Sequence, residues 1–165
     1  MCPINGQTGY SIAAISIIDA LTKLGVNVSL FPIGNEQCFA HSKYHDSLQK
    51  SLQNAQFFNF IAPCLRIFHQ FSMAEFVGKG QHVGFPFFEL DKFSDLEKHH
   101  LAAPNDLLVS SKWASQIVCD EMYNFFEGWS PTVIPLGVDQ EIFKASPINK
   151  NKRTVFLHVG NWEFR

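Results

Sequence analysis

The stretch SIAAISIIDALTKLGVNVSLFP, residues 11–32, decides the fold class. Its first half repeats isoleucine and leucine at helical spacing and stops at Gly25, so we predict a helix over residues 11–24. Its second half alternates apolar residues from Val26 up to Pro32, which predicts a strand directly after the helix. A helix followed at once by a strand indicates an α/β unit.

The same alternation continues along the chain. Short apolar runs bounded by turn residues predict five more strands, over residues 64–68, 82–88, 106–110, 132–135 and 154–159. A helical pattern covers residues 112–126, and either Ser110 or Ser111 is placed to cap it. Strands alternating with helices predict a Rossmann-like, doubly wound parallel sheet, which binds ligands beyond the carboxyl ends of its strands.

The length of 165 residues fits one domain and little more. We expect a Rossmann-like domain over residues 1–146 and a polar, turn-rich linker over 147–153. Residues 154–165 would then be the first strand and loop of a second, truncated domain.

Composition excludes several classes of protein. A hydrophobic fraction of 46% is typical of a folded domain, and a net charge of −2 argues against a nucleic-acid partner. Seventeen phenylalanines indicate either a phenylalanine-rich core or an aromatic-lined cleft. Four cysteines without a C-x-x-C pair, and no signal peptide or membrane span, favour a cytoplasmic protein with reduced, mostly buried thiols.

Three segments are candidates for binding or catalysis. The loop Gly6, Gln7, Thr8, Gly9, Tyr10 opens the first helix and would let a ligand approach backbone N–H groups, although no strand precedes it and two glycines also suit a plain tight turn. His69 follows an apolar strand and could bind a hydroxyl or move a proton, or be a structural histidine. Glu89 could hold sugar hydroxyls with Phe87 or Phe88 as an apolar platform, or lie in a solvated turn.

Metal and hydrolase sites are not expected. The pairs His41 with His45 and His99 with His100 lack a zinc-binding pattern and lie in polar surroundings. The chain also has no G-x-S-x-G elbow and no Walker-type phosphate loop.

Three further pieces, in order and spacing, point to a family. They are PLGVDQEIF at 135–143, HVGNWEFR at 158–165 and SKWA at 111–114. The sequence resembles the group 1 (family 4) glycosyltransferases of the GT-B fold, which have two facing Rossmann-like domains with the active site between them. The resemblance covers essentially the whole chain, as the N-terminal domain and the start of the C-terminal one.

The resemblance implies transfer of a sugar from a nucleotide-sugar donor to a glycan, lipid or protein acceptor, usually with retention and without an essential metal or other cofactor. The loop 6–10 would approach the donor phosphates and the acceptor, and His69 would be the catalytic candidate near the transferred sugar. Asn161 stands where the family has Arg or Lys against the donor diphosphate, and Arg165 could partly substitute for it. With the C-terminal domain missing, the fragment alone would have little activity.

Two other functions remain open at this point. The chain could be a stand-alone module that binds a glycan or a partner without transferase activity. A different Rossmann-like enzyme is disfavoured, because the dinucleotide fingerprint is absent.

Overall fold

The computed structural model describes residues 1–34, 41–125, 128–141 and 143–145. One parallel sheet runs in the order β1 (Cys64–His69), β2 (His82–Phe87), β3 (Asp106–Val109) and β4 (Thr132–Val133). The helices are α1 (Gly9–Lys23), α2 (His45–Asn54), α3 (Asp95–Ala102) and α4 (Lys112–Glu121), with short 3-10 turns η1 (Ser42–Tyr44), η2 (Ala55–Phe57) and η3 (Gln70–Ser72). The prediction of a Rossmann-like, doubly wound α/β fold is confirmed.

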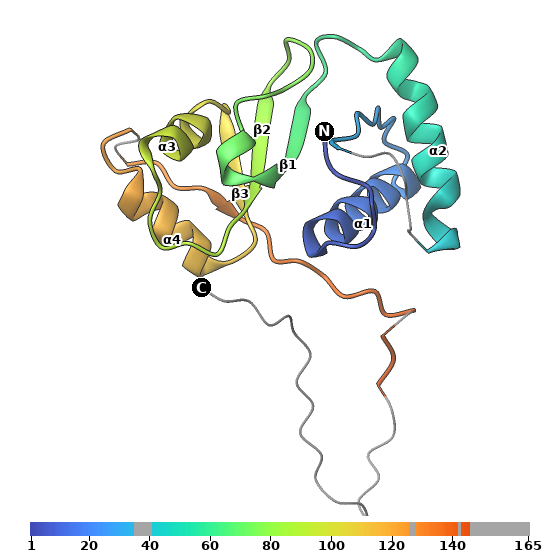
Figure 1. The fold of residues 1–165 in the computed structure, drawn as a ribbon. Coiled ribbons are helices and arrows are strands. Elements are labelled where there is room, and N and C mark those ends of the chain that lie inside the picture. Colours follow the sequence, from blue (N-terminus) through green and yellow to red (C-terminus); the bar gives the residue numbers. More distant parts are fainter. Residues whose placement is uncertain (35–40, 126–127, 142, 146–165) are drawn as a thin grey trace, which may run out of the picture.

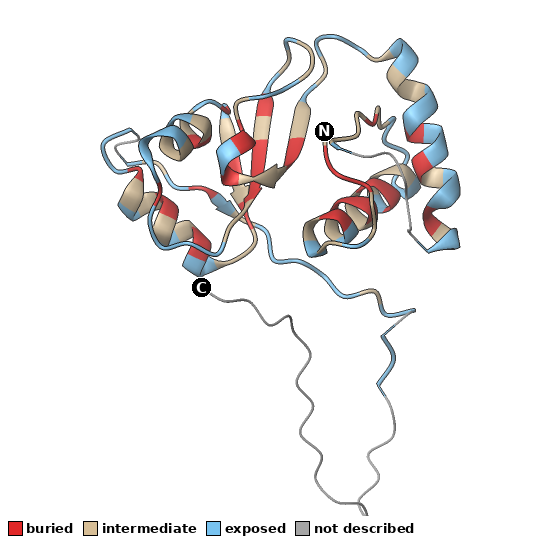
Figure 2. Cartoon of the chain, in the orientation of Figure 1, coloured by how far each residue is buried: buried red, intermediate tan, exposed pale blue. Residues whose placement is uncertain are grey.

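The sheet separates two layers of helices and two apolar clusters (Figure 1). Helices α1 and α2 cover one face, and α3 and α4 cover the other. Ile15, Ile67 and Phe85 belong to the cluster under α1, and Leu101 and Val118 to the cluster under α3 and α4. Figure 2 shows the buried residues of α1 and α4 as stripes, as expected where one side of a helix packs on a sheet.

The predicted strand over residues 26–31 is wrong. Leu30 is buried as its pattern requires, but its N–H donates to the carbonyl of Ser51 on α2, 2.9 Å away, instead of to a strand. Two residues after Leu30, Pro32 forms an isolated parallel bridge with Cys2, outside the four strands of the sheet. Alternation therefore predicted the burial of Leu30 correctly, but Val26 is exposed, and the hydrogen bonding of the segment was predicted incorrectly.

As predicted, no strand precedes the glycine loop among the described residues, but the first residues of the chain lie against the sheet. The ammonium of Met1 donates to the carbonyl of Leu65 at 2.6 Å, and the N–H of Ile67 donates to the carbonyl of Met1 at 2.9 Å. With the Cys2 bridge on its other side, this segment has hydrogen-bonded neighbours on both flanks. The glycine loop thus connects an extended segment to α1, as in a strand-to-helix turn.

The other described elements that were predicted lie close to their predicted positions: α1 begins two residues earlier, β1 ends one residue later, and β2, β3 and β4 end earlier. Helix α4 ends at Glu121 rather than near 126, and Phe125, expected on its apolar side, is exposed. Of the two candidate caps, Ser111 is the cap, since its Oγ accepts the N–H of Ala114 at 3.1 Å. The predicted linker 147–153 and the segment 154–165 lie outside the described residues.

The described cysteines are free thiols, and they are less buried than predicted. Cys2 is buried, whereas Cys64 and Cys119 are half-buried. Burial raises the pKa of the Cys2 thiol to about 11. Cys2 therefore acts as a small apolar core residue.

Gly84 in β2 is required by packing. A Cβ at this position would lie 2.7 Å from Cδ2 of Leu107 and 3.1 Å from Sδ of Met73, both of which are fully buried. We expect Gly84→Ala to lower the free energy of unfolding by about 1–3 kcal/mol, because the core must open to admit a methyl group. Chemical denaturation of Gly84→Ala and Gly137→Ala tests this, since no described heavy atom lies within 4 Å of a Cβ at Gly137. Equal stability of the two variants would contradict the packing.

Candidate functional site

The glycine loop is held in shape by its own side chains. Gly6 has a φ of 70°, a conformation that suits glycine, and its N–H donates to Oγ of Ser11 at 2.8 Å. Oδ1 of Asn5 accepts the N–H groups of Gln7 and Thr8 at 3.0 and 3.4 Å. The loop is therefore ordered before any ligand arrives.

Helix α1 begins without a side-chain cap. Thr8 is at its N-cap position and makes no capping hydrogen bond, whereas Ser94 caps α3 and Ser111 caps α4. The first-turn N–H groups of α1 follow the glycine loop and carry the positive end of the helix dipole. Such a helix end can accept an anion.

His69 and Tyr10 are brought together at the carboxyl end of β1. Their ring centroids lie 4.8 Å apart in an edge contact, and Tyr10 is also 6.4 Å from Phe87 at the end of β2. On its other side His69 stacks on Phe71 at 5.2 Å with an interplanar angle of 13°. The fold thus joins two candidates, the loop and His69, that are separated by about sixty residues in the sequence.

Phe88 and Glu89 have different surroundings. Phe87 contacts Tyr10, whereas Phe88 packs on Phe93 and Trp113, at 5.0 and 5.9 Å between centroids, on the α3 and α4 side of the sheet. Glu89 follows at the surface and is exposed. Of the two aromatic residues suggested as a platform, Phe87 is the one beside the loop and His69.

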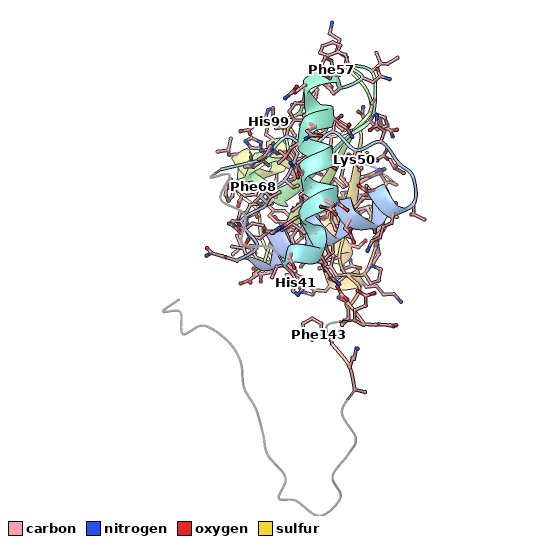
Figure 3. All side chains as sticks on the ribbon, turned by 90° about the vertical axis from the view of Figure 1, so that its right-hand side faces the viewer. His41, Lys50, Phe57, Phe68, His99 and Phe143 are labelled. Atoms are coloured by element: carbon pink, nitrogen blue, oxygen red, sulfur yellow. The ribbon has the colours of Figure 1, made fainter. Side chains whose placement is uncertain are left out.

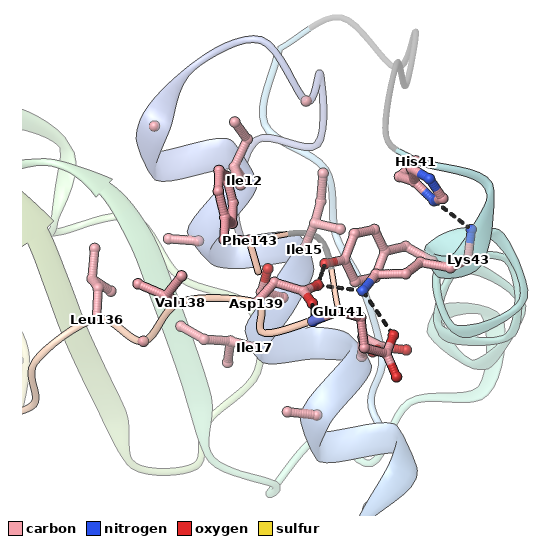
Figure 4. A pocket seen from close by; sticks show the side chains of 18 of the residues that line it. Ile12, Ile15, Ile17, His41, Lys43, Leu136, Val138, Asp139, Glu141 and Phe143 are labelled. Atoms are coloured by element: carbon pink, nitrogen blue, oxygen red, sulfur yellow. Dashed lines mark hydrogen bonds and ion pairs between the residues drawn. The ribbon is translucent and has the colours of Figure 1, made fainter. Parts of the chain in front are cut away.

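A pocket of about 930 Å³ lies along the outer side of α1 (Figure 4). Gly6 and Gly9 line it where the helix begins, so it is continuous with the glycine loop. Apolar side chains make up most of its wall, namely Ile12, Ile15 and Ile17 from α1 and Leu136, Val138 and Phe143 from the segment after β4. Its size is in the range of small-molecule sites.

Polar and charged side chains hold the segment after β4 against η1, the turn that precedes α2. The ammonium of Lys43 is paired with the carboxylate of Asp139 and lies 3.3 Å from Glu141, and the hydroxyl of Tyr44 donates to Asp139 at 2.7 Å (Figure 4). The hydrogen bond to Asp139 is the main cause that raises the pKa of Lys43. Asp139 belongs to the Pro-x-Gly-Val-Asp piece, but its partners lie about 95 residues earlier and no sequence pattern predicted them.

The paired histidines include two that accept backbone N–H groups. Nδ1 of His41 accepts the N–H of Lys43 at 3.3 Å, and Nδ1 of His100 accepts the N–H of Ala74 at 3.2 Å. Among the described residues no group of three His, Cys, Asp or Glu side chains could hold a metal ion. In the same part of the chain, no helix is long and apolar enough to cross a membrane.

His82, at the start of β2, was not predicted as a special residue. Its side chain is only 2% exposed, and neither ring nitrogen has a hydrogen-bond partner among the described residues. Burial, with the nearby charges of Arg66 and the Met1 ammonium, lowers the pKa of His82 to about 4. In the sequence His82 lies between Gln81 and Val83 at the start of a strand, and nothing there distinguishes it from an ordinary surface histidine.

In a comparison with known proteins, no family model, curated protein or solved structure matches the chain. The two residues predicted to face a donor diphosphate, Asn161 and Arg165, lie outside the described residues.

Proposed function

We propose that this chain forms the acceptor-side domain of a glycosyltransferase that moves a sugar from a nucleotide-sugar donor to a glycan, lipid or protein acceptor. The observation that carries the proposal is the uncapped start of α1, with Tyr10 beside His69 at the carboxyl end of the sheet. The uncapped amides suit a phosphate-bearing substrate, and the imidazole suits a sugar hydroxyl next to it. The apolar pocket along α1 gives room for part of the acceptor.

Each group has a defined part in this proposal. The first-turn N–H groups stabilise negative charge on the donor phosphates, which grows as the sugar leaves. His69, held between Tyr10 and Phe71, hydrogen-bonds the transferred sugar and so orients its anomeric carbon toward the acceptor. No metal or cofactor is required by these roles, because amides and imidazole supply the interactions.

The test is donor turnover by the protein as its gene encodes it, with release of nucleoside diphosphate measured for common UDP-, GDP- and ADP-sugars. We expect one donor class to be used and His69→Ala to lower kcat at least tenfold, through loss of a hydrogen bond to the substrate. His99→Ala is the matched control, since His99 is an exposed histidine on α3.

Two results would overturn the proposal. One is binding of glycans without any donor turnover, which would assign the chain to a binding module. The other is equal turnover by His69→Ala and His99→Ala, which would remove His69 from the site.

A further inference from the structure

Three large apolar side chains are exposed together on a loop far from the glycine loop. Phe57 is 89% exposed, Phe60 51% and Ile61 74%, and all three lie between the end of α2 and the start of β1. Figure 3 shows Phe57 at the extreme end of the molecule, beyond the last turn of α2. Exposed apolar clusters of this kind mark surfaces that meet a partner.

The backbone of this tip is fixed. The N–H of Lys79 donates to the carbonyl of Phe60 at 2.7 Å, which joins the tip to the loop before β2. At Gly80 a Cβ would lie 2.1 Å from the carbonyl oxygen of Ala62, so the two loops touch backbone to backbone. Phe58 turns inward and packs edge-on against Phe31, with ring centroids 5.0 Å apart. The outward side chains are thus presented by an ordered loop.

The two segments that form the tip carry a single charge. The tip segment, residues 55–63, and the supporting loop, residues 77–81, contain one lysine and no acidic residue. That lysine, Lys79, holds its ammonium 5.8 Å from the centroid of the Phe60 ring. The carboxylate of Asp106 accepts a hydrogen bond from Gln81, at the end of the supporting loop next to β2. Apolar rings with an adjacent cation match the boundary between acyl chains and anionic headgroups.

We propose that the tip formed by Phe57, Phe60 and Ile61 inserts into the surface of an anionic lipid bilayer, with Lys79 at the headgroups. The apolar side chains enter the acyl boundary, and the rigid loop inserts without further loss of backbone freedom. This attachment is peripheral and independent of the transferase proposal, because the tip shares no residue with the glycine loop or His69.

The area of the tip favours a membrane over a protein partner. Three side chains of this size offer on the order of 400–500 Å². A stable protein interface takes about 800 Å² from each partner. A bilayer needs no matching surface, since apolar side chains bind by entering the boundary between headgroups and acyl chains.

The test is co-sedimentation of the purified chain with phosphatidylcholine vesicles, with and without one quarter phosphatidylglycerol. We expect binding to the anionic vesicles, weaker binding to the neutral ones, and a decrease with added salt. The double variant Phe57→Ser/Ile61→Ser should partition at least tenfold more weakly, and Lys79→Glu should lose the preference for anionic vesicles.

The control is Leu90→Ser/Leu96→Ser, which removes exposed apolar side chains from the α3 region. It should bind vesicles as the wild type does, and thermal melts should show all variants folded. Equal partition of the tip variant and the wild type would overturn the proposal, as would absence of vesicle binding. So would a wild-type dimer that the tip variant dissociates without any vesicle binding, because the tip would then dock on a second copy. Vesicle binding is measured without a donor, so its failure is distinct from failure of the transferase proposal.

Discussion

Between pH 7 and pH 5 the protein should lose about 2 kcal/mol of its free energy of unfolding through the side chain of His82 alone. The folded state holds this imidazole neutral down to a pKa of about 4, whereas the unfolded chain takes up a proton near 6.5. Stability due to His82 is therefore present above pH 6.5 and falls as the pH is lowered toward 4. Below pH 4 the full loss is about 3 kcal/mol.

The physical cause of this loss lies in what surrounds the ring. The Phe76 ring centroid is 4.3 Å from that of His82, and the Arg66 guanidinium and Met1 ammonium are the charges that act on it. A protonated His82 would be buried next to like charges with no carboxylate acceptor among its described hydrogen-bond partners. Folding and protonation of His82 therefore oppose each other.

The measurement is the free energy of unfolding by urea at pH 7, 6 and 5 for the wild type and His82→Phe. The variant should be no less stable than the wild type at pH 7, because it removes two unsatisfied buried nitrogens, and should be more stable at pH 5. Asp19, Glu97 and Glu121 have lowered pKa values, so their losses begin in the acid range of carboxylates and are common to both proteins. Parallel pH profiles for the two proteins would show that His82 is not held neutral.

The sequence predicts burial here better than it predicts pairing. The apolar alternation over residues 26–31 places Leu30 in the core. The alternation does not indicate whether a strand or the end of a helix will accept the backbone N–H of Leu30. In the structure α2 supplies that partner, through Ser51, and Asn54 donates its side-chain N–H to the carbonyl of Val28 at 3.0 Å. Strand pairing depends on neighbours far along the chain, which periodicity does not report.

The sequence predicted those residues of the candidate site whose position follows from the order of strands and helices. His69 could be placed at the ligand edge of the sheet because it follows an apolar run, whereas the glycine loop could not, since no strand was predicted before it. The fold brings Tyr10 of that loop into contact with His69. The pair Lys43 and Asp139 could not be predicted, since each residue is ordinary in its own segment. The sequence also did not predict that both ring nitrogens of His82 are buried without a hydrogen-bond partner among the described residues, because this depends on which groups surround the ring in the folded structure.

The phenylalanines divide into groups that composition alone could not separate. Phe85 and Phe93 are in the buried core, Phe87 borders the candidate site, and Phe57 and Phe60 form the exposed tip. The core predicted from the phenylalanine-rich composition is present, whereas the aromatic-lined cleft stays a prediction. The same substitution at different phenylalanines should then have very different consequences.

Phe85→Ala should lower the free energy of unfolding by about 3–5 kcal/mol, the range for loss of a buried aromatic ring. Phe85 is 2% exposed at the centre of β2, opposite Ile67 of β1, and its ring lies 5.2 Å from that of Phe87. Removing it leaves a cavity in the cluster under α1 that the surrounding strands cannot close. For a domain of this size the loss corresponds to a decrease in Tm of roughly 10 °C.

Phe57→Ala is the matched control, because it removes the same ring from a position that is 89% exposed. It should change stability by no more than about 0.5 kcal/mol. The measurement is the free energy of unfolding of both variants, by heat and by urea. A Phe85→Ala variant as stable as Phe57→Ala would contradict the placement of β2 in the core. A Phe57→Ala variant as stable as the wild type would show that folding does not depend on this ring.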